Sequence, residues 1–151
     1  MLKNRLDSHI DFMRIFISDI NTLVAHRLKY IRQQYQVSLE QSQVLTLLAN
    51  GKAMTLTEIT EKQGVNKAAV SRRVKKLVEL KLVKWAPVNE NHDQRLKYIV
   101  IAAKGRRFLD ENNMEIRDLV GEMLDDLSNE EIETARSVLE TVDQRLKEQL
   151  P

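Results

Sequence analysis

The sequence contains no cysteine, only two prolines and four glycines, and no long run of apolar residues. Without cysteine the chain can form neither disulfides nor thiolate–zinc sites nor thiol-based redox sensors. So few glycines and prolines favour long, uninterrupted helices. The apolar runs fall short of the roughly 18 residues that a transmembrane helix needs. Charged residues also interrupt positions 1–16, where a signal peptide has its apolar core, so we expect a cytoplasmic protein with no membrane partner.

The small net charge of +2 hides a strong segregation of charge along the chain. Residues 52–107 carry 14 basic and 5 acidic side chains, whereas residues 108–151 carry 4 basic and 13 acidic ones. A local basic excess of this size suits a polyanionic partner such as nucleic acid. The alternative is that two solvated surfaces simply differ in charge.

Apolar periodicity and helix-capping signals predict the order α-α-α-α-β-β-α-α. Residues 6–35 lack glycine and proline and place apolar side chains three or four positions apart, which is typical of one long amphipathic helix. Three later helices open with a capping-box spacing, in the pairs Ser38 with Gln41, Thr55 with Glu58, and Ser128 with Glu131. Gly51 and Gly64 end the first two of these helices. Asn66 is a favourable N-cap for the helix over residues 67–81.

Two β-strands are predicted at residues 82–88 and 96–102, joined by the polar loop 89–95. Pro87 confines the first strand to a sheet edge or a bulge, and the lone Trp85 on this strand is expected in the hydrophobic core. The helical pattern resumes after Gly105.

The long helices at the two ends of the chain cannot wrap a compact core of their own. Their apolar stripes therefore predict a homodimer in which a second copy covers them. The alternative is a monomer that folds these helices back on itself.

Residues 66–80, placed on a helix, separate into an apolar side and a basic side. The apolar side, expected to be buried, comprises Val70, Val74 and Leu77, and the basic side comprises Ala68, Ser71, Arg72 and Lys75, flanked by Lys76 and Arg73. Small residues let the start of a helix enter the major groove of DNA, and arginine and lysine reach bases and phosphates. A solvated surface helix would look similar, but a short helix and the tight turn "KQGVN" precede this one and favour a helix-turn-helix. The residues predicted to contact DNA from this helix are Lys67, Ala68, Ser71, Arg72, Lys75 and Lys76.

A helix-turn-helix followed directly by a two-stranded hairpin is a winged helix, in which "NENHDQR" (89–95) forms the wing tip. Arg95 can reach into the minor groove, where the negative potential is deepest. Asp93 alone would be repelled by phosphate, so we expect it to orient the Arg95 guanidinium through a charge-assisted hydrogen bond. Both residues are predicted to belong to the DNA-binding site. The alternative is a surface ion pair that contributes little.

The run from Leu56 to Gly105 resembles the DNA-binding core of the MarR family of winged-helix transcriptional regulators. The family's patterns are Leu-x-x-x-Gly-Leu-[Val/Ile], an Asp-x-Arg wing and Leu-Thr-x-x-Gly, which correspond to Leu77 to Val83, Asp93 to Arg95 and Ile101 to Gly105. The similarity covers roughly residues 38–108 in motif and nearly the whole chain in helix order. Two residues depart from the pattern. Lys81 replaces a glycine and should adopt a left-handed or otherwise altered conformation, and Ala102 replaces a threonine that caps the following helix.

The resemblance implies a mainly α fold: a winged helix-turn-helix with a two-stranded β-wing, and long N- and C-terminal helices that form a dimerisation layer. Residues 1–36 and 106–151 would supply the dimerisation helices, and residues 37–105 the DNA-binding domain. The resemblance also implies a symmetric homodimer on pseudo-palindromic double-stranded DNA, with Arg72 and Arg95 as main contacts. In the family, small aromatic acids bind where the dimerisation helices meet the DNA-binding lobe. A small aromatic or other effector ligand is thus expected as a further partner, although no residue identifies it.

We therefore predict a dimeric, sequence-specific transcriptional regulator, most often a repressor in this family. Two alternatives stay open: a nonspecific architectural DNA binder, and a winged-helix adaptor that docks an acidic protein. The sequence contains no phosphate-binding loop, nucleophile elbow or paired catalytic residues, so neither an enzymatic activity nor a cofactor is predicted. His9, His26 and His92 lack the spacing of metal ligands, and no metal site is predicted.

Overall fold

The computed structural model describes residues 2–87, 93 and 95–150. The chain divides into two compact units, and the division falls between Ile116 and Arg117. None of the helices in the described part of the chain combines the length and apolar character needed to cross a bilayer. The predicted separation into dimerisation helices (1–36 and 106–151) and a DNA-binding domain (37–105) concerns assembly with a second chain and stays a prediction.

The long N-terminal helix is interrupted once, which corrects the expectation of a single helix over residues 6–35. Helix α1 spans Leu2–Arg27 and α2 spans Lys29–Tyr35. Leu28 lies between them, with φ −86° and ψ −1°. The Arg32 guanidinium donates a hydrogen bond of 2.7 Å to the carbonyl of Ala25, one of the groups left open at the end of α1. The periodic pattern continues across this break, so it gave no sign of it.

The next helices begin where their caps predict. Helix α3 (Leu39–Leu47) and α4 (Leu56–Gln63) each open with a complete capping box, from Ser38 with Gln41 and from Thr55 with Glu58. Helix α4 ends at Gly64, which has a left-handed φ of 65°. Helix α3 ends earlier than expected, four residues before Gly51. These caps satisfy backbone N–H groups that a helix start leaves without partners.

Within the described residues the sheet has three strands rather than two. Strands β2 (Val83–Trp85) and β3 (Tyr98–Ile101) form the predicted hairpin, with Lys84 opposite Val100. A two-residue strand β1 (Met54–Thr55) pairs with the other edge of β3. The order is therefore β1-β3-β2, all antiparallel, and β2 lies at an edge as Pro87 predicts. A strand of only two residues has no periodicity for a sequence pattern to reveal.

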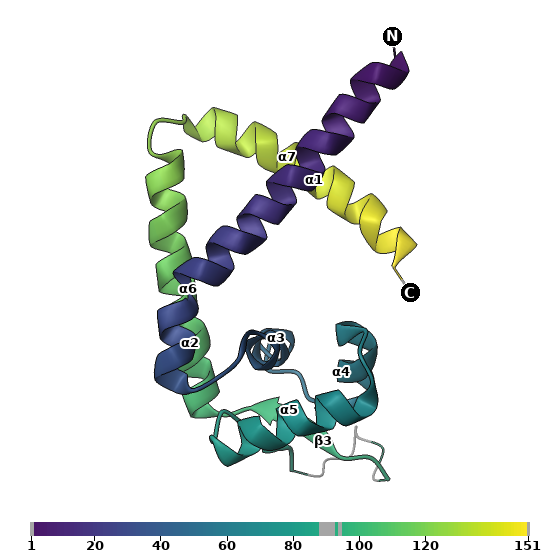
Figure 1. Ribbon diagram of the computed structural model, residues 1–151, viewed down its shortest axis with the longest axis vertical. Helices are drawn as coiled ribbons and strands as arrows, with labels where there is room; N and C mark the ends of the chain where they lie inside the picture. Colours follow the sequence, from purple (N-terminus) through teal and green to yellow (C-terminus); the bar gives the residue numbers. More distant parts are fainter. Residues whose placement is uncertain (1, 88–92, 94, 151) are drawn as a thin grey trace. The chain divides into compact units, whose positions relative to one another are not determined.

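The core of the first unit lies where α3, α4 and α5 (Lys67–Glu79) meet the sheet. Figure 1 shows α3 end-on above α5, with α4 beside it. The side chains exposed by 2% or less are Ile31, Val44, Leu45, Leu48, Ile59, Val70, Val74, Leu77, Leu82, Val83, Ile99 and Phe108. Full burial of each such side chain is worth roughly 1.5–3 kcal/mol relative to exposure. This cluster therefore fixes α5 on the sheet.

Helix α6 (Ala103–Leu124) begins before Gly105 rather than after it. A Cβ atom at Gly105 would lie 2.2 Å from the carbonyl oxygen of Leu82, so only glycine allows this close approach. Lys81, the residue before Leu82, has a left-handed φ of 61°. This was predicted because Lys81 stands where the family pattern has a glycine. Together these two residues set the turn from α5 into β2 against the start of α6.

The second unit is formed by the last part of α6 and by α7 (Asn129–Gln149). Helix α7 opens with the third predicted capping box, from Ser128 with Glu131. None of its residues is buried. Its apolar side chains Val138, Leu139, Val142 and Leu146 are 51–61% exposed. This helix therefore presents an apolar stripe that the described chain leaves uncovered.

Candidate nucleic-acid interface

The start of α5 is fixed by the turn that precedes it. Gly64 closes α4 in the left-handed conformation, and the Asn66 side chain accepts a hydrogen bond of 2.8 Å from the backbone N–H of Ala69. Helix α5 therefore begins at Lys67, as predicted, with a well-formed cap. The backbone N–H groups of its first turn carry partial positive charge that favours phosphate.

The predicted separation of α5 into two sides is confirmed. Val70, Val74 and Leu77 are exposed by 2% or less and pack into the core. Every α5 residue predicted to contact DNA is exposed, namely Lys67, Ala68, Ser71, Arg72, Lys75 and Lys76. The exposed side is thus basic, and it begins with the small residue Ala68. Whether these residues contact DNA stays a prediction.

Arg73 differs from the other basic residues of α5. The pattern placed it at the flank of the exposed basic side, but it is only half-exposed. Its Nη1 donates a hydrogen bond of 2.7 Å to Oε1 of Gln63 at the end of α4. This guanidinium therefore faces helix α4, whereas the Arg72 side chain is exposed to solvent.

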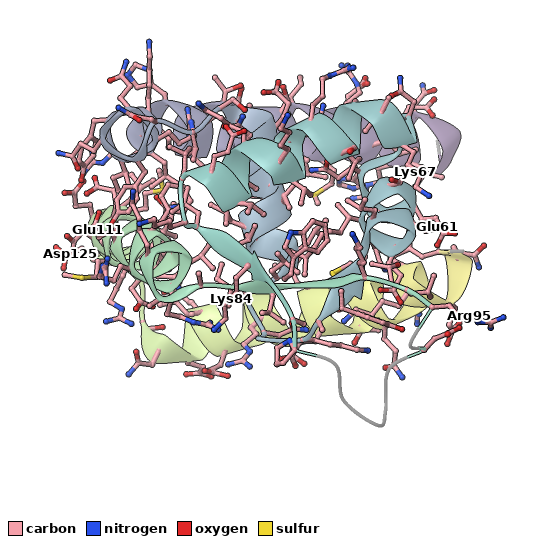
Figure 2. All side chains as sticks on the ribbon, turned by 90° about the horizontal axis from the view of Figure 1, so that it is seen from below. Glu61, Lys67, Lys84, Arg95, Glu111 and Asp125 are labelled. Carbon is pink, nitrogen blue, oxygen red and sulfur yellow. The ribbon has the colours of Figure 1, made fainter. Side chains whose placement is uncertain are left out.

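On the hairpin, Asp93 and Arg95 form the predicted pair. Arg95 donates from Nε and Nη2 to the two carboxylate oxygens of Asp93, at 3.1 and 3.0 Å, and its backbone N–H donates to the same carboxylate at 3.0 Å. The Arg95 guanidinium, followed by its backbone N–H, lowers the pKa of Asp93 below the ordinary value. The Arg95 side chain is still 89% exposed, and it extends outward from the hairpin in Figure 2. The rest of the predicted wing tip, residues 89–92 and 94, lies outside the described residues.

Trp85 is not a core residue, which corrects the prediction from its position on a strand. It is 45% exposed, and the Nζ of Lys97 lies 5.7 Å from its ring centroid. Trp85 also shares a cleft of about 350 Å³ with Ser71 and Lys75 of α5. Trp85 ends a three-residue edge strand, and among the described residues no further strand lies beyond it to cover the side chain. The hairpin thus adjoins α5 at the cleft that Trp85 lines, and within the hairpin Lys97 covers the Trp85 ring, a contact that the sequence pattern missed.

The relatives of this chain are transcriptional regulators. The chain is 49% identical over 142 residues to the HTH-type transcriptional regulator TcaR of Staphylococcus aureus (strain Newman), covering 94% of this chain and 93% of that relative. A model of the MarR family matches residues 35–92. This chain belongs to the MarR family.

Solved structures of MarR regulators share its fold. A MarR family protein from Bacillus stearothermophilus has a TM-score of 0.76 at 20% identity, covering 93% of this chain and 97% of that one. NadR in complex with 4-hydroxyphenylacetate has a TM-score of 0.64 at 15% identity, covering 86% and 91%. The fold predicted from the motifs, a mainly helical winged helix-turn-helix, is confirmed. As a MarR protein this chain is a DNA-binding transcriptional regulator.

Proposed function

We propose that this MarR protein is a dimeric repressor that binds one pseudo-palindromic operator. The observation that carries the proposal is the exposed basic side of α5, which starts with Lys67 and Ala68 and continues through Arg72 and Lys75. The first residues of this helix would enter the major groove, with Arg72 reading base edges and the lysines contacting phosphates. The target is chromosomal DNA, so we place the protein in the cytoplasm.

A second copy of the chain is the proposed cover for the apolar terminal helices. On α1, side chains such as Ile10, Phe12 and Ile17 are more than half exposed, as are Leu139 and Leu146 on α7. The second unit also contains a largely apolar cleft of about 480 Å³ between the end of α6 and α7. Exposed apolar stripes of this length indicate an interface. A two-fold dimer would present two α5 helices to major grooves about one turn, roughly 34 Å, apart.

The hairpin is proposed to reach the minor groove on either side. Arg95 is charged, almost fully exposed and held in direction by Asp93. An arginine inserted into a narrow minor groove gains from the negative potential there. Asp93 would act as the orienting residue.

An effector is proposed to bind a cleft of about 400 Å³ in the first unit, between α1, α2, α3 and α6. Its polar lining includes Asn21, Arg32, Gln43, Thr46 and Asn112. The Oδ1 atom of Asn112 is buried and has no hydrogen-bond partner among the described residues, and Arg32 adds a cationic side chain to the same lining. NadR was crystallised with 4-hydroxyphenylacetate, and we propose a small aromatic acid of this kind here. A coupling of about 1–3 kcal/mol would lower operator affinity about 5–150-fold.

Selection of bound sites from random DNA, followed by footprinting and salt titration, tests the proposal. We expect one palindrome, bound roughly a thousandfold or more tightly than random duplex, with a steep salt dependence. A steep salt dependence without preference would instead identify an architectural binder. No DNA binding at all would favour the remaining alternative, a winged-helix adaptor that docks an acidic protein. A reporter gene placed behind the selected site should be silenced by the protein, and activation would contradict the repressor role.

A further inference from the structure

Arg73 lies on the recognition helix but not on its DNA-facing side. It follows Arg72 by about 100° around the helix, which brings it next to the buried stripe of Val70, Val74 and Leu77. Arg72 is exposed, whereas Arg73 is half-buried where α5 packs against α4 and α3. Its position is therefore that of a contact between helices.

Arg73 begins a chain of hydrogen bonds that crosses all three helices. Its Nη1 donates to Gln63 Oε1 at 2.7 Å, and Gln63 Nε2 donates to the backbone carbonyl of Glu40 at 3.3 Å. Gln63 is the last residue of α4, and Glu40 lies in the first turn of α3. A guanidinium has only donors, so only the oxygen of the amide can face it, and this fixes which way Gln63 points.

The geometry points to Arg73 as a positioning residue that sets the angle of the recognition helix against α4 and α3. This inference rests on the proposed entry of α5 into the major groove. Base-edge contacts depend on that angle because hydrogen bonds to bases tolerate little displacement. Phosphate contacts by flexible lysines do not depend on it to the same extent. Loss of the relay should therefore weaken operator binding while leaving binding to random DNA intact.

The test compares Arg73→Met, Gln63→Leu and the double variant on the selected operator and on a random-sequence duplex, each over a series of salt concentrations. We expect each single variant to lose about tenfold in operator affinity. Random-duplex affinity and the salt slope should stay at wild-type values, and the double variant should be no weaker than the weaker single variant. Arg73→Lys should recover part of the loss because it keeps a charged donor. Lys75→Met is the matched control for a phosphate contact on the same helix, and its salt slope should fall by about one.

The active fraction of each preparation, titrated with excess operator, separates positioning from misfolding. A folding defect would lower the active fraction and weaken both duplexes equally, which would overturn the inference. A salt slope reduced by about one in Arg73→Met, with Gln63→Leu behaving as wild type, would make Arg73 a phosphate contact instead. A wild-type protein that binds every duplex alike overturns the proposed function itself. A wild-type preference that both variants keep overturns only the role of Arg73.

Discussion

The helix-turn-helix region and the terminal helices are both rich in aliphatic side chains, yet they use them in opposite ways. Between α3 and β3, side chains such as Leu45, Leu77 and Ile99 are completely buried within one chain. On α7 no residue is buried, and Leu139 is 55% exposed. The first region completes its core alone, and the second has an apolar stripe but no core. The same residue types therefore stabilise a fold in one place and lie exposed in the other.

Along α1 and α2 the apolar side chains change from exposed to buried. Their apolar stripe starts with Ile10 and Ile17, which are more than half exposed, and ends with Ile31, which is 2% exposed in the core. The spacing of apolar residues is the same throughout. Periodicity thus identifies which side of a helix is apolar, but what covers that side depends on tertiary and quaternary neighbours.

The largest effect that separates the two regions is expected from Leu77→Ala. Leu77 is completely buried on α5, so its truncation should lower the free energy of unfolding by about 2–5 kcal/mol. Denaturant unfolding at several protein concentrations measures it. The loss should be the same at each concentration because the contact lies within one chain. The matched control is Leu96→Ala at a site that is 51% exposed, where a change within about 0.5 kcal/mol is expected.

The second prediction concerns the other region. Leu139→Glu places a charge in the apolar stripe of α7, and we expect the dissociation constant of the dimer to rise about a hundredfold or more. Analytical ultracentrifugation measures this, and circular dichroism should show unchanged helix content. Gln144→Glu adds the same charge on the opposite side of α7 and should leave the dimer intact. Equal dissociation constants for Leu139→Glu and wild type would place the interface elsewhere.

The third prediction concerns the exposed charges that the two regions carry. Arg95→Ala should weaken operator binding by about 1–3 kcal/mol without changing dimerisation. Arg14 on α1 offers a matched control, because it too is an exposed arginine paired with a nearby aspartate, Asp11, at 3.3 Å. Arg14→Ala should change operator affinity by less than about 0.5 kcal/mol. Fluorescence anisotropy at fixed salt compares them, and equal effects would remove the hairpin from the interface.

Asp93→Asn separates direction from charge in the same measurement. If Asp93 only repels phosphate, its neutralisation should strengthen binding. If it orients the Arg95 guanidinium through the paired hydrogen bonds at 3.0 and 3.1 Å, binding should weaken although the protein has lost a negative charge. We expect weaker binding.

What the sequence could predict follows from how local each feature is. The local predictions are confirmed. Each capping box joins residues three positions apart, Asp93 pairs with Arg95 two positions away, and the left-handed conformation concerns Lys81 alone. Trp85 was predicted wrongly because its place on a strand does not tell how far neighbouring elements cover the side chain. The inward contact of Arg73 was missed because its partner Gln63 lies 10 positions away in sequence. Which residues contact DNA stays a prediction.

The smallest expected effect lies where α1 and α2 meet α6. Glu115 on α6 accepts hydrogen bonds from Arg27 Nε and, at 3.0 Å, from the Tyr30 hydroxyl. Arg27 first, and Tyr30 second, lower the pKa of Glu115 below its ordinary value of 4.5. Because the pKa is lower in the folded state, the contribution to stability is present in full above the unfolded-state value. It is lost as the pH falls through the folded-state pKa.

Glu115→Gln removes this titration, so the free energy of unfolding should decline less steeply below pH 4.5 than in the wild type, while at pH 7 the variant should be slightly less stable. Denaturant unfolding over a pH series measures both. Arg27→Met removes the principal partner of Glu115 and should flatten the same part of the profile. The double variant should show no further change in the acid slope because both substitutions break the same ion pair. An unchanged acid slope in Glu115→Gln would mean that the end of α1 is held on α6 by apolar packing instead. In that case no ion pair would stabilise the place where the exposed apolar side chains of α1 give way to the buried core at Ile31. The two regions would then differ only in how far their apolar side chains are buried.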